Sequence, residues 1–177
     1  MTNFVYIATS LDNFIATSEG GLDWLDEIPK SEGNDFGYAE FMSSIDALVM
    51  GRKTFEKVAS FEVWPYDKPV FVLGRSKISV PVELEDKIEI VNETPQILVN
   101  NLKARGYQNL YIDGGFTIQS FLVEDLIDEM IITRVPILLG KGVPLFGELR
   151  HRLYFKHKKT RILNEMLVQS HYIRIMN

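Results

Sequence analysis

The sequence predicts an α/β fold: a three-layer α/β/α sandwich with a mixed, mostly parallel sheet and a C-terminal antiparallel hairpin. Two observations lead to this fold class. Short runs of Val, Ile and Leu alternate with amphipathic stretches as far as residue 132, which is the pattern of parallel strands joined by crossover helices. Residues 154–176 hold two β-rich runs joined near Asn164, as in a hairpin. With 177 residues, we expect one domain over 1–177.

Six strands are expected before the hairpin, each as a short apolar run bounded by turn residues. They are predicted at residues 3–10, 47–50, 69–73, 88–91, 110–112 and 130–132. Two longer stretches rich in Gly and Pro, 11–34 and 136–146, are predicted as loops, the first with a short helix near Trp24.

Four longer helices are predicted between the strands. The first covers 36–45 with Asn34 or Asp35 as its cap, and the second begins at Gly51–Thr54. The third lies between a Thr–Pro start at Thr94 and Gly106. The fourth is indicated by apolar residues at positions 118, 121 and 122.

Composition narrows the function classes. The net charge of -5 and the pI near 5.3 argue against a nucleic-acid partner. No apolar run approaches the ~20 residues of a membrane helix, so no membrane partner is expected. The absence of Cys excludes thiolate nucleophiles and Cys-ligated zinc and fits a cytoplasmic location, and no other metal-ligand spacing is visible.

Ligands of open α/β sheets bind at the carboxyl ends of the strands, which here directs attention to three strand–helix junctions. At the first, Gly51 allows close backbone approach, Arg52 and Lys53 add positive charge, and Thr54 adds a hydroxyl donor at a helix start. This combination favours an anion site. A glycine turn with solvated basic residues explains the same motif about equally well.

Two further strand ends carry similar signals. Leu73-Gly74-Arg75-Ser76 offers an Arg that could hold a phosphate with two hydrogen bonds, although an exposed loop Arg is the simpler reading. Asp113-Gly114-Gly115-Phe116-Thr117 again joins a strand to a helix, with room for a pyrophosphate, or forms only a tight turn. Together the three junctions predict a dinucleotide with several phosphates.

Two carboxylates are the candidate catalytic residues. Asp35 lies near a helix start beside Phe36, where an apolar cleft would raise its pKa so that it could hold or relay a proton. A helix cap is an equally good explanation of Asp35. Asp12 follows the first strand and could bind a polar substrate, or only close a turn, which is the commoner use of Asp-Asn.

In order and spacing, the segments Tyr6–Ala16, Asp46–Thr54, Val72–Ser76, Tyr111–Gly115 and Leu126–Phe146 resemble the dihydrofolate reductase superfamily. The last part is more similar to the reductase domain of the bifunctional riboflavin-biosynthesis enzyme and its small stand-alone bacterial relatives. Asn13 stands where the riboflavin-type motif has Gly.

The resemblance implies NADPH as the cofactor and assigns the residues that would bind it. Arg52 and Arg75 with Ser76 would hold the adenosine 2′-phosphate, and Ala8 and Ile15 would flank the nicotinamide. The pyrophosphate and the rest of the cofactor site would involve Gly51, Lys53, Thr54, Leu73, Gly74, Asp113, Gly114, Gly115, Phe116 and Thr117.

The expected function is NADPH-dependent hydride transfer to a pyrimidine- or pterin-like heterocycle, with Asp35 orienting the substrate and Asp12 in support. The resemblance includes 5-amino-6-(5-phosphoribosylamino)uracil reductase. Dihydrofolate reduction and non-catalytic NADPH binding remain alternatives. The resemblance also implies a homodimer. Besides the second copy of the chain, the expected partner is the small-molecule heterocyclic substrate.

Overall fold

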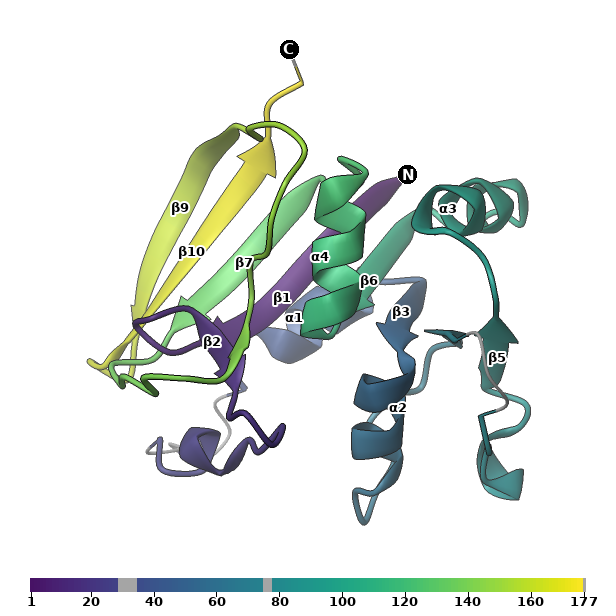
Figure 1. The fold of residues 1–177 in the computed structure, drawn as a ribbon, viewed down its shortest axis with the longest axis horizontal. Helices are drawn as coiled ribbons and strands as arrows, with labels where there is room; N and C mark the ends of the chain where they lie inside the picture. The colour runs from purple at the N-terminus through teal and green to yellow at the C-terminus, as the bar shows by residue number, and fades with distance from the viewer. Residues whose placement is uncertain (29–34, 75–77, 177) are drawn as a thin grey trace.

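One eight-stranded sheet organises the molecule (Figure 1). The computed structural model describes residues 1–28, 35–74 and 78–176. Within this part of the chain the strand order is β5-β4-β3-β6-β1-β7-β10-β9. The strands are β1 (Thr2–Thr9), β3 (Ala47–Gly51), β4 (Val70–Leu73), β5 (Ile88–Val91), β6 (Asn109–Asp113), β7 (Glu129–Arg134), β9 (Phe155–Leu163) and β10 (Leu167–Arg174).

The sheet is mixed and mostly parallel, as predicted. The strands from β5 to β7 in the sheet order all run parallel, and β10 is antiparallel to both β7 and β9. Figure 1 shows the β9–β10 hairpin at one edge and β5 at the other. The ends of the six early strands differ from the predicted ranges by at most two residues. The hairpin prediction is also confirmed.

Helices cover both faces of the sheet and complete the three layers. On β3, Ala47 and Val49 pack in one apolar cluster with α3 (Pro95–Ala104) and α4 (Gly115–Val123). Leu48 and Met50 point to the opposite face, where they pack with α1 (Tyr38–Ser43) and α2 (Arg52–Ala59). This alternation follows from the two-residue period of a strand. No helix of the described residues is long and apolar enough to cross a membrane.

The two stretches predicted as loops contain strands, so that part of the prediction is wrong. Strands β2 (Phe14–Ala16) and β8 (Val143–Pro144) form a small antiparallel sheet. A Cβ at Gly142 would overlap the Ala16 carbonyl oxygen, so glycine is needed for the two backbones to approach. The expected short helix at Trp24 is present as η1 (Asp23–Leu25), and another, η2 (Val82–Leu84), was not expected.

The first turns of α2 and α4 lie side by side at the carboxyl edge of the sheet. In register, Met50 of β3 is opposite Asp113 of β6, so the two strands end at the same level. A Cβ at Gly114 would overlap Thr54 Oγ1, and a Cβ at Gly51 would lie 2.9 Å from Thr117 Oγ1. Each helix start therefore contacts a glycine at the start of the other.

We expect Gly114→Ala to destabilise the protein more than Gly106→Ala. Both glycines have a positive φ, of 86° and 96°, which costs an alanine roughly 1–2 kcal/mol. Only position 114 also lacks space, because Gly106 has no atom within 4 Å of an added Cβ. Overpacking should add about 1–3 kcal/mol at position 114.

Denaturant unfolding of both alanine variants measures these losses. Thr54→Ala in the Gly114→Ala background should recover part of the loss, because it removes the overlapping hydroxyl. Equal losses for the two alanine variants would contradict the close approach of α2 and α4.

Candidate active site

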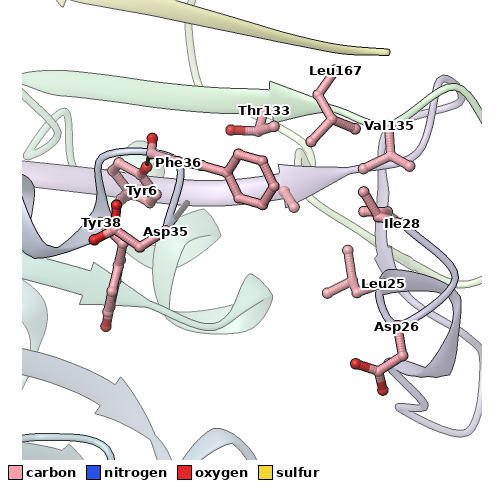
Figure 2. Close-up of a pocket in the computed structure, with 11 residues that line it drawn as sticks. Tyr6, Leu25, Asp26, Ile28, Asp35, Phe36, Tyr38, Thr133, Val135 and Leu167 are labelled. Carbon is pink, nitrogen blue, oxygen red and sulfur yellow. Dashed lines mark hydrogen bonds between the residues drawn. The ribbon is translucent and has the colours of Figure 1, made fainter. Parts of the chain in front are cut away.

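A cavity of about 280 Å³ lies on the α1 face of the sheet, against the C-terminal halves of β1 and β7. In Figure 2, Tyr6, Asp35 and Tyr38 lie on one side and face Leu25, Asp26 and Ile28 across the cavity. Strand residues close a third side. The lining is completed by Ala8, Phe36, Thr133, Val135 and Leu167. We call this cavity the aromatic pocket, because Tyr6, Phe36 and Tyr38 contribute rings to it.

A buried polar network fixes the wall of the aromatic pocket. Gln169 Nε2 donates to Tyr6 Oη at 3.1 Å and to Thr133 Oγ1 at 3.0 Å. Arg161 donates to Gln169 Oε1, and Tyr6 Oη donates to the Phe36 carbonyl at 2.9 Å. The hairpin thus holds both Tyr6 and the chain at residue 36.

Sequence reasoning missed Gln169 and Arg161. The available signal was the position of Gln169 on the same face of β10 as buried Leu167 and His171, where the two-residue period predicts apolar side chains. A buried polar side chain in such a place needs partners. Its partners could not be identified because Tyr6 lies 163 residues away in the chain.

Asp35 lines the aromatic pocket, as expected of a substrate-orienting acid, but its electrostatics differ from the prediction. Its carboxylate accepts from Gly37 N at 2.9 Å and from Ala39 N at 2.6 Å, at the start of α1. These hydrogen bonds lower the pKa of Asp35, so the prediction of a raised pKa is wrong. Asp35 binds the helix start as a cap would and remains an anion. Its role toward a substrate stays a prediction.

Asp12 holds two loops together and is not among the described residues that line the aromatic pocket. Ser10 Oγ donates to it at 2.6 Å and Gly140 N at 2.7 Å, and these bonds lower its pKa. The next residue, Asn13, has φ 64°, which explains why a residue tolerant of left-handed backbone replaces Gly there. The geometry favours the turn interpretation of Asp12.

Two of the three predicted phosphate-binding segments, Gly51–Thr54 and Asp113–Thr117, meet at the starts of α2 and α4. Gly51 and Gly114, the N-cap residues of these helices, make no side-chain cap hydrogen bond, and the first N–H groups of a helix have no partner within the helix itself, so such a helix start can bind an anion. A Cβ at Gly115 would lie 2.8 Å from Ile15 Cδ1, which brings the predicted nicotinamide and pyrophosphate segments together. Thr54 and Thr117 lie between these helix starts, as the glycine contacts show.

The charged residues of this region lie at the surface. Arg52 and Lys53 are exposed, and Arg52 Nε is paired with Glu56 Oε1 at 2.6 Å. The Phe116 side chain is 86% exposed in the first turn of α4. Gly74 N donates to the Val91 carbonyl and so extends the pairing of β4 with β5 by one residue after Leu73. The predicted 2′-phosphate residues Arg75 and Ser76 lie outside the described residues.

The environment of Asp113 raises the pKa of its carboxyl group. Burial is the cause, and it outweighs the opposing hydrogen bond from Gly114 N at 2.8 Å. The pKa values of the Tyr38, Tyr66 and Tyr111 phenols are raised too, first by burial and second by the Asp113 charge. Asp113 ends β6 directly before α4, two residues after Tyr111, whose hydroxyl donates to the Tyr6 carbonyl at 2.9 Å.

No group of three or more His, Asp or Glu side chains among the described residues could hold a metal ion. Of the three carboxylates considered, Asp12 and Asp35 accept backbone hydrogen bonds that lower the pKa of each, and Asp113 is the one whose pKa is raised by burial.

Comparison with known proteins agrees with this architecture. The chain is 39% identical to the uncharacterized Bacillus subtilis protein YwjB over 96% of each chain. A solved structure from Shewanella sp. PV-4, provisionally named a riboflavin biosynthesis protein, is 50% identical and superposes with a TM-score of 0.95, covering 99% of this chain and all of that one.

A more distant structure shares the fold. The Thermotoga maritima diaminohydroxyphosphoribosylaminopyrimidine deaminase/5-amino-6-(5-phosphoribosylamino)uracil reductase is 16% identical with a TM-score of 0.77, over 98% of this chain and 56% of that one. The family model described as the RibD C-terminal domain matches residues 4–168. The chain belongs to the RibD C-terminal domain family and has a dihydrofolate reductase-like fold.

Proposed function

We propose that this protein is an NADPH-dependent reductase that transfers a hydride to a pyrimidine- or pterin-like heterocycle. The observation that carries the proposal is the position of Asp113. Its backbone leads into the Gly114–Gly115 helix start, and two residues earlier the Tyr111 hydroxyl donates to the carbonyl of Tyr6, a lining residue of the aromatic pocket, at 2.9 Å. An anion site and a ring-sized pocket are therefore adjacent, as a reductase with a phosphate-bearing coenzyme requires.

The residues at the carboxyl edge fit NADPH. The close approach at Gly51, Gly114 and Gly115 would let the pyrophosphate reach the backbone N–H groups of α2 and α4. Ala8 lines the aromatic pocket and Ile15 lies near Gly115, which supports the proposal that both would flank the nicotinamide. When bound, NADPH would supply the hydride, whereas the protein supplies orientation and charge.

The aromatic pocket fits a flat, nitrogen-containing ring. Tyr6, Phe36 and Tyr38 offer aromatic surfaces for stacking or edge contacts. Asp35 can accept hydrogen bonds from ring amino groups. Reduction of a polar double bond also needs a proton, and Asp113, with its raised pKa, is the carboxyl group suited to hold one.

NADPH should bind more tightly than NADH, by at least about tenfold, because Arg52 would meet the extra phosphate. Fluorescence titration with both coenzymes measures this preference. Arg52→Ala should reduce it, whereas Arg105→Ala should not. Arg105 is the matched control because it is similarly exposed and also pairs with a Glu. Equal affinity of the wild type for NADPH and NADH would contradict the assignment of Arg52.

Asp35→Asn should lower turnover by about tenfold or more on any heterocycle that the enzyme reduces, because the charge that orients the substrate is lost. Asparagine keeps one acceptor for the α1 backbone. Glu40→Gln removes a charge from the same helix start without touching the pocket and serves as the control.

NADPH consumption in steady state gives these turnover numbers. Unchanged turnover of Asp35→Asn would eliminate its substrate role. Reduction of dihydrofolate with inhibition by an antifolate would favour the dihydrofolate reductase alternative. NADPH binding without oxidation by any heterocycle would favour the non-catalytic alternative.

Asp113→Asn should change how stability depends on pH. A carboxyl group whose pKa is raised on folding binds its proton more tightly in the folded chain than in the unfolded chain. The free energy of unfolding therefore falls as pH rises and the group ionises. This loss of stability begins near the ordinary pKa of 3.8 and is complete once the pH exceeds the raised pKa of the folded state. We therefore expect the wild type to lose stability relative to the variant as pH rises from about 4.

Denaturant unfolding of both proteins over a pH series measures this difference. Asp35→Asn provides the opposite sign: because folding lowers the pKa of Asp35, the stability that its charge contributes is lost as pH falls. A difference between wild type and Asp113→Asn that stays constant with pH would contradict the buried-acid assignment. If Asp113 holds the reaction's proton, its Asn variant should also lose about 10²-fold in turnover.

A further inference from the structure

We propose that Thr133 donates a hydrogen bond to the substrate, and that Gln169 and Arg161 of the hairpin set the direction of its hydroxyl proton. A substrate that fits this arrangement places a carbonyl oxygen or an unprotonated ring nitrogen against Thr133 Oγ1. The inference rests on the proposed function and adds a residue that determines which edge of the heterocycle is recognised.

The hairpin fixes the orientation of the Gln169 amide. Arg161 Nε and Nη2 both donate to the amide oxygen Oε1, Nε at 3.2 Å. A guanidinium has donors and no acceptor, so the amide atom that faces Arg161 must be the oxygen. The amide nitrogen of Gln169 therefore faces the other way, toward the side chains of Tyr6 and Thr133.

The Gln169 amide uses its two hydrogens on two hydroxyl oxygens. Nε2 donates to Tyr6 Oη at 3.1 Å and to Thr133 Oγ1 at 3.0 Å. A hydroxyl group has one proton, and a hydroxyl that accepts from Gln169 must direct its own proton elsewhere. Tyr6 directs its proton to the Phe36 carbonyl oxygen at 2.9 Å. The proton of Thr133 is likewise directed away from Gln169.

Thr133 lies where this proton can reach a ligand. The residue lines the aromatic pocket, and Figure 2 shows it between Tyr6 and Val135 in this view. It is 7% exposed, so the pocket is the open space beside it. Among the described residues, the partner of Thr133 Oγ1 is the Gln169 amide, from which it accepts. An acceptor on a bound ring would therefore meet a donor whose direction is already set.

Asp35 offers the opposite kind of group from another part of the lining. Its carboxylate is an acceptor, whereas Thr133 is a donor. A ring with an amino or N–H group for Asp35 and a carbonyl oxygen for Thr133 satisfies both residues. An analogue with an amino group in place of that carbonyl would set two donors against each other at Thr133. Amino-oxo pyrimidines and pterins have the matching pattern.

Pterin and 2,4-diaminopteridine test the inference, because the second compound has an amino group where pterin has its carbonyl. Fluorescence titration of the full chain without coenzyme, at a pH at which both rings are neutral, gives the two affinities. We expect the wild type to bind pterin at least about tenfold more tightly, since the diamino compound leaves the Thr133 proton without an acceptor.

Thr133→Val should remove this preference, because valine is similar in shape and has no hydroxyl, whereas Thr133→Ser should retain it. The matched control is Thr160→Val, which removes a hydroxyl that bonds Ser170 on the same hairpin, outside the pocket. Because the readout is a ratio of two affinities on one variant, a general loss of folded protein does not mimic it.

Gln169→Glu tests the part played by the hairpin. A glutamate of the same shape accepts and does not donate, so Thr133 should turn its proton toward residue 169 and offer lone pairs to the pocket. The preference for pterin should fall by at least about tenfold or reverse. In the Thr133→Val background the same substitution should change the ratio little, because the hydroxyl through which it acts is gone.

Equal or tighter binding of 2,4-diaminopteridine by the wild type would overturn the inference, as would an unchanged ratio in Thr133→Val or no measurable binding of either probe. A Gln169→Glu effect that is absent, or that persists without the Thr133 hydroxyl, would overturn the role of the hairpin. Parallel titration with NADPH separates these failures from failure of the proposed function. Normal NADPH binding leaves the reductase proposal standing, and loss of NADPH binding removes both.

Discussion

The close contact between the starts of α2 and α4 is the constraint on which the candidate site depends. Gly114 has room only for a hydrogen opposite Thr54, and Gly51 is nearly as restricted by Thr117. Because β3 and β6 end at the same level, this contact brings together two helix starts, whose first N–H groups have no partner within their own helix. The turn from β6 into α4 begins at Asp113 and so sets the position of its carboxyl group.

The three carboxylates show how position, more than residue type, determines acidity. Asp12 and Asp35 lie at the surface and accept backbone hydrogen bonds, so the pKa of each is lowered. Asp113 accepts a backbone bond too, yet burial among tyrosines has the larger effect and raises its pKa. Neighbouring carboxyl groups of one fold can thus differ in acidity, one made more acidic by backbone hydrogen bonds and another less acidic by burial.

The hairpin does more than close the sheet. Through Gln169 and Arg161 it reaches Tyr6 and the carbonyl of Phe36, and so determines the shape of the aromatic pocket. Gly37 leaves the space that this requires, because a Cβ there would lie 2.9 Å from Arg161 Nη2. Segments from both ends of the chain therefore form one pocket wall (Figure 2).

The sequence by itself determined the sheet, the main helices and the glycine junctions at Gly51 and Gly114, because hydrophobic periods and turn residues are local signals. It could not find β2 and β8, which are too short to show a period and depend on the fit of Gly142 against Ala16. It also misjudged Asp35 and missed Gln169. Only the tertiary structure decided the pKa of each carboxylate and the partners of each buried polar group, because both depend on contacts between residues distant in the chain.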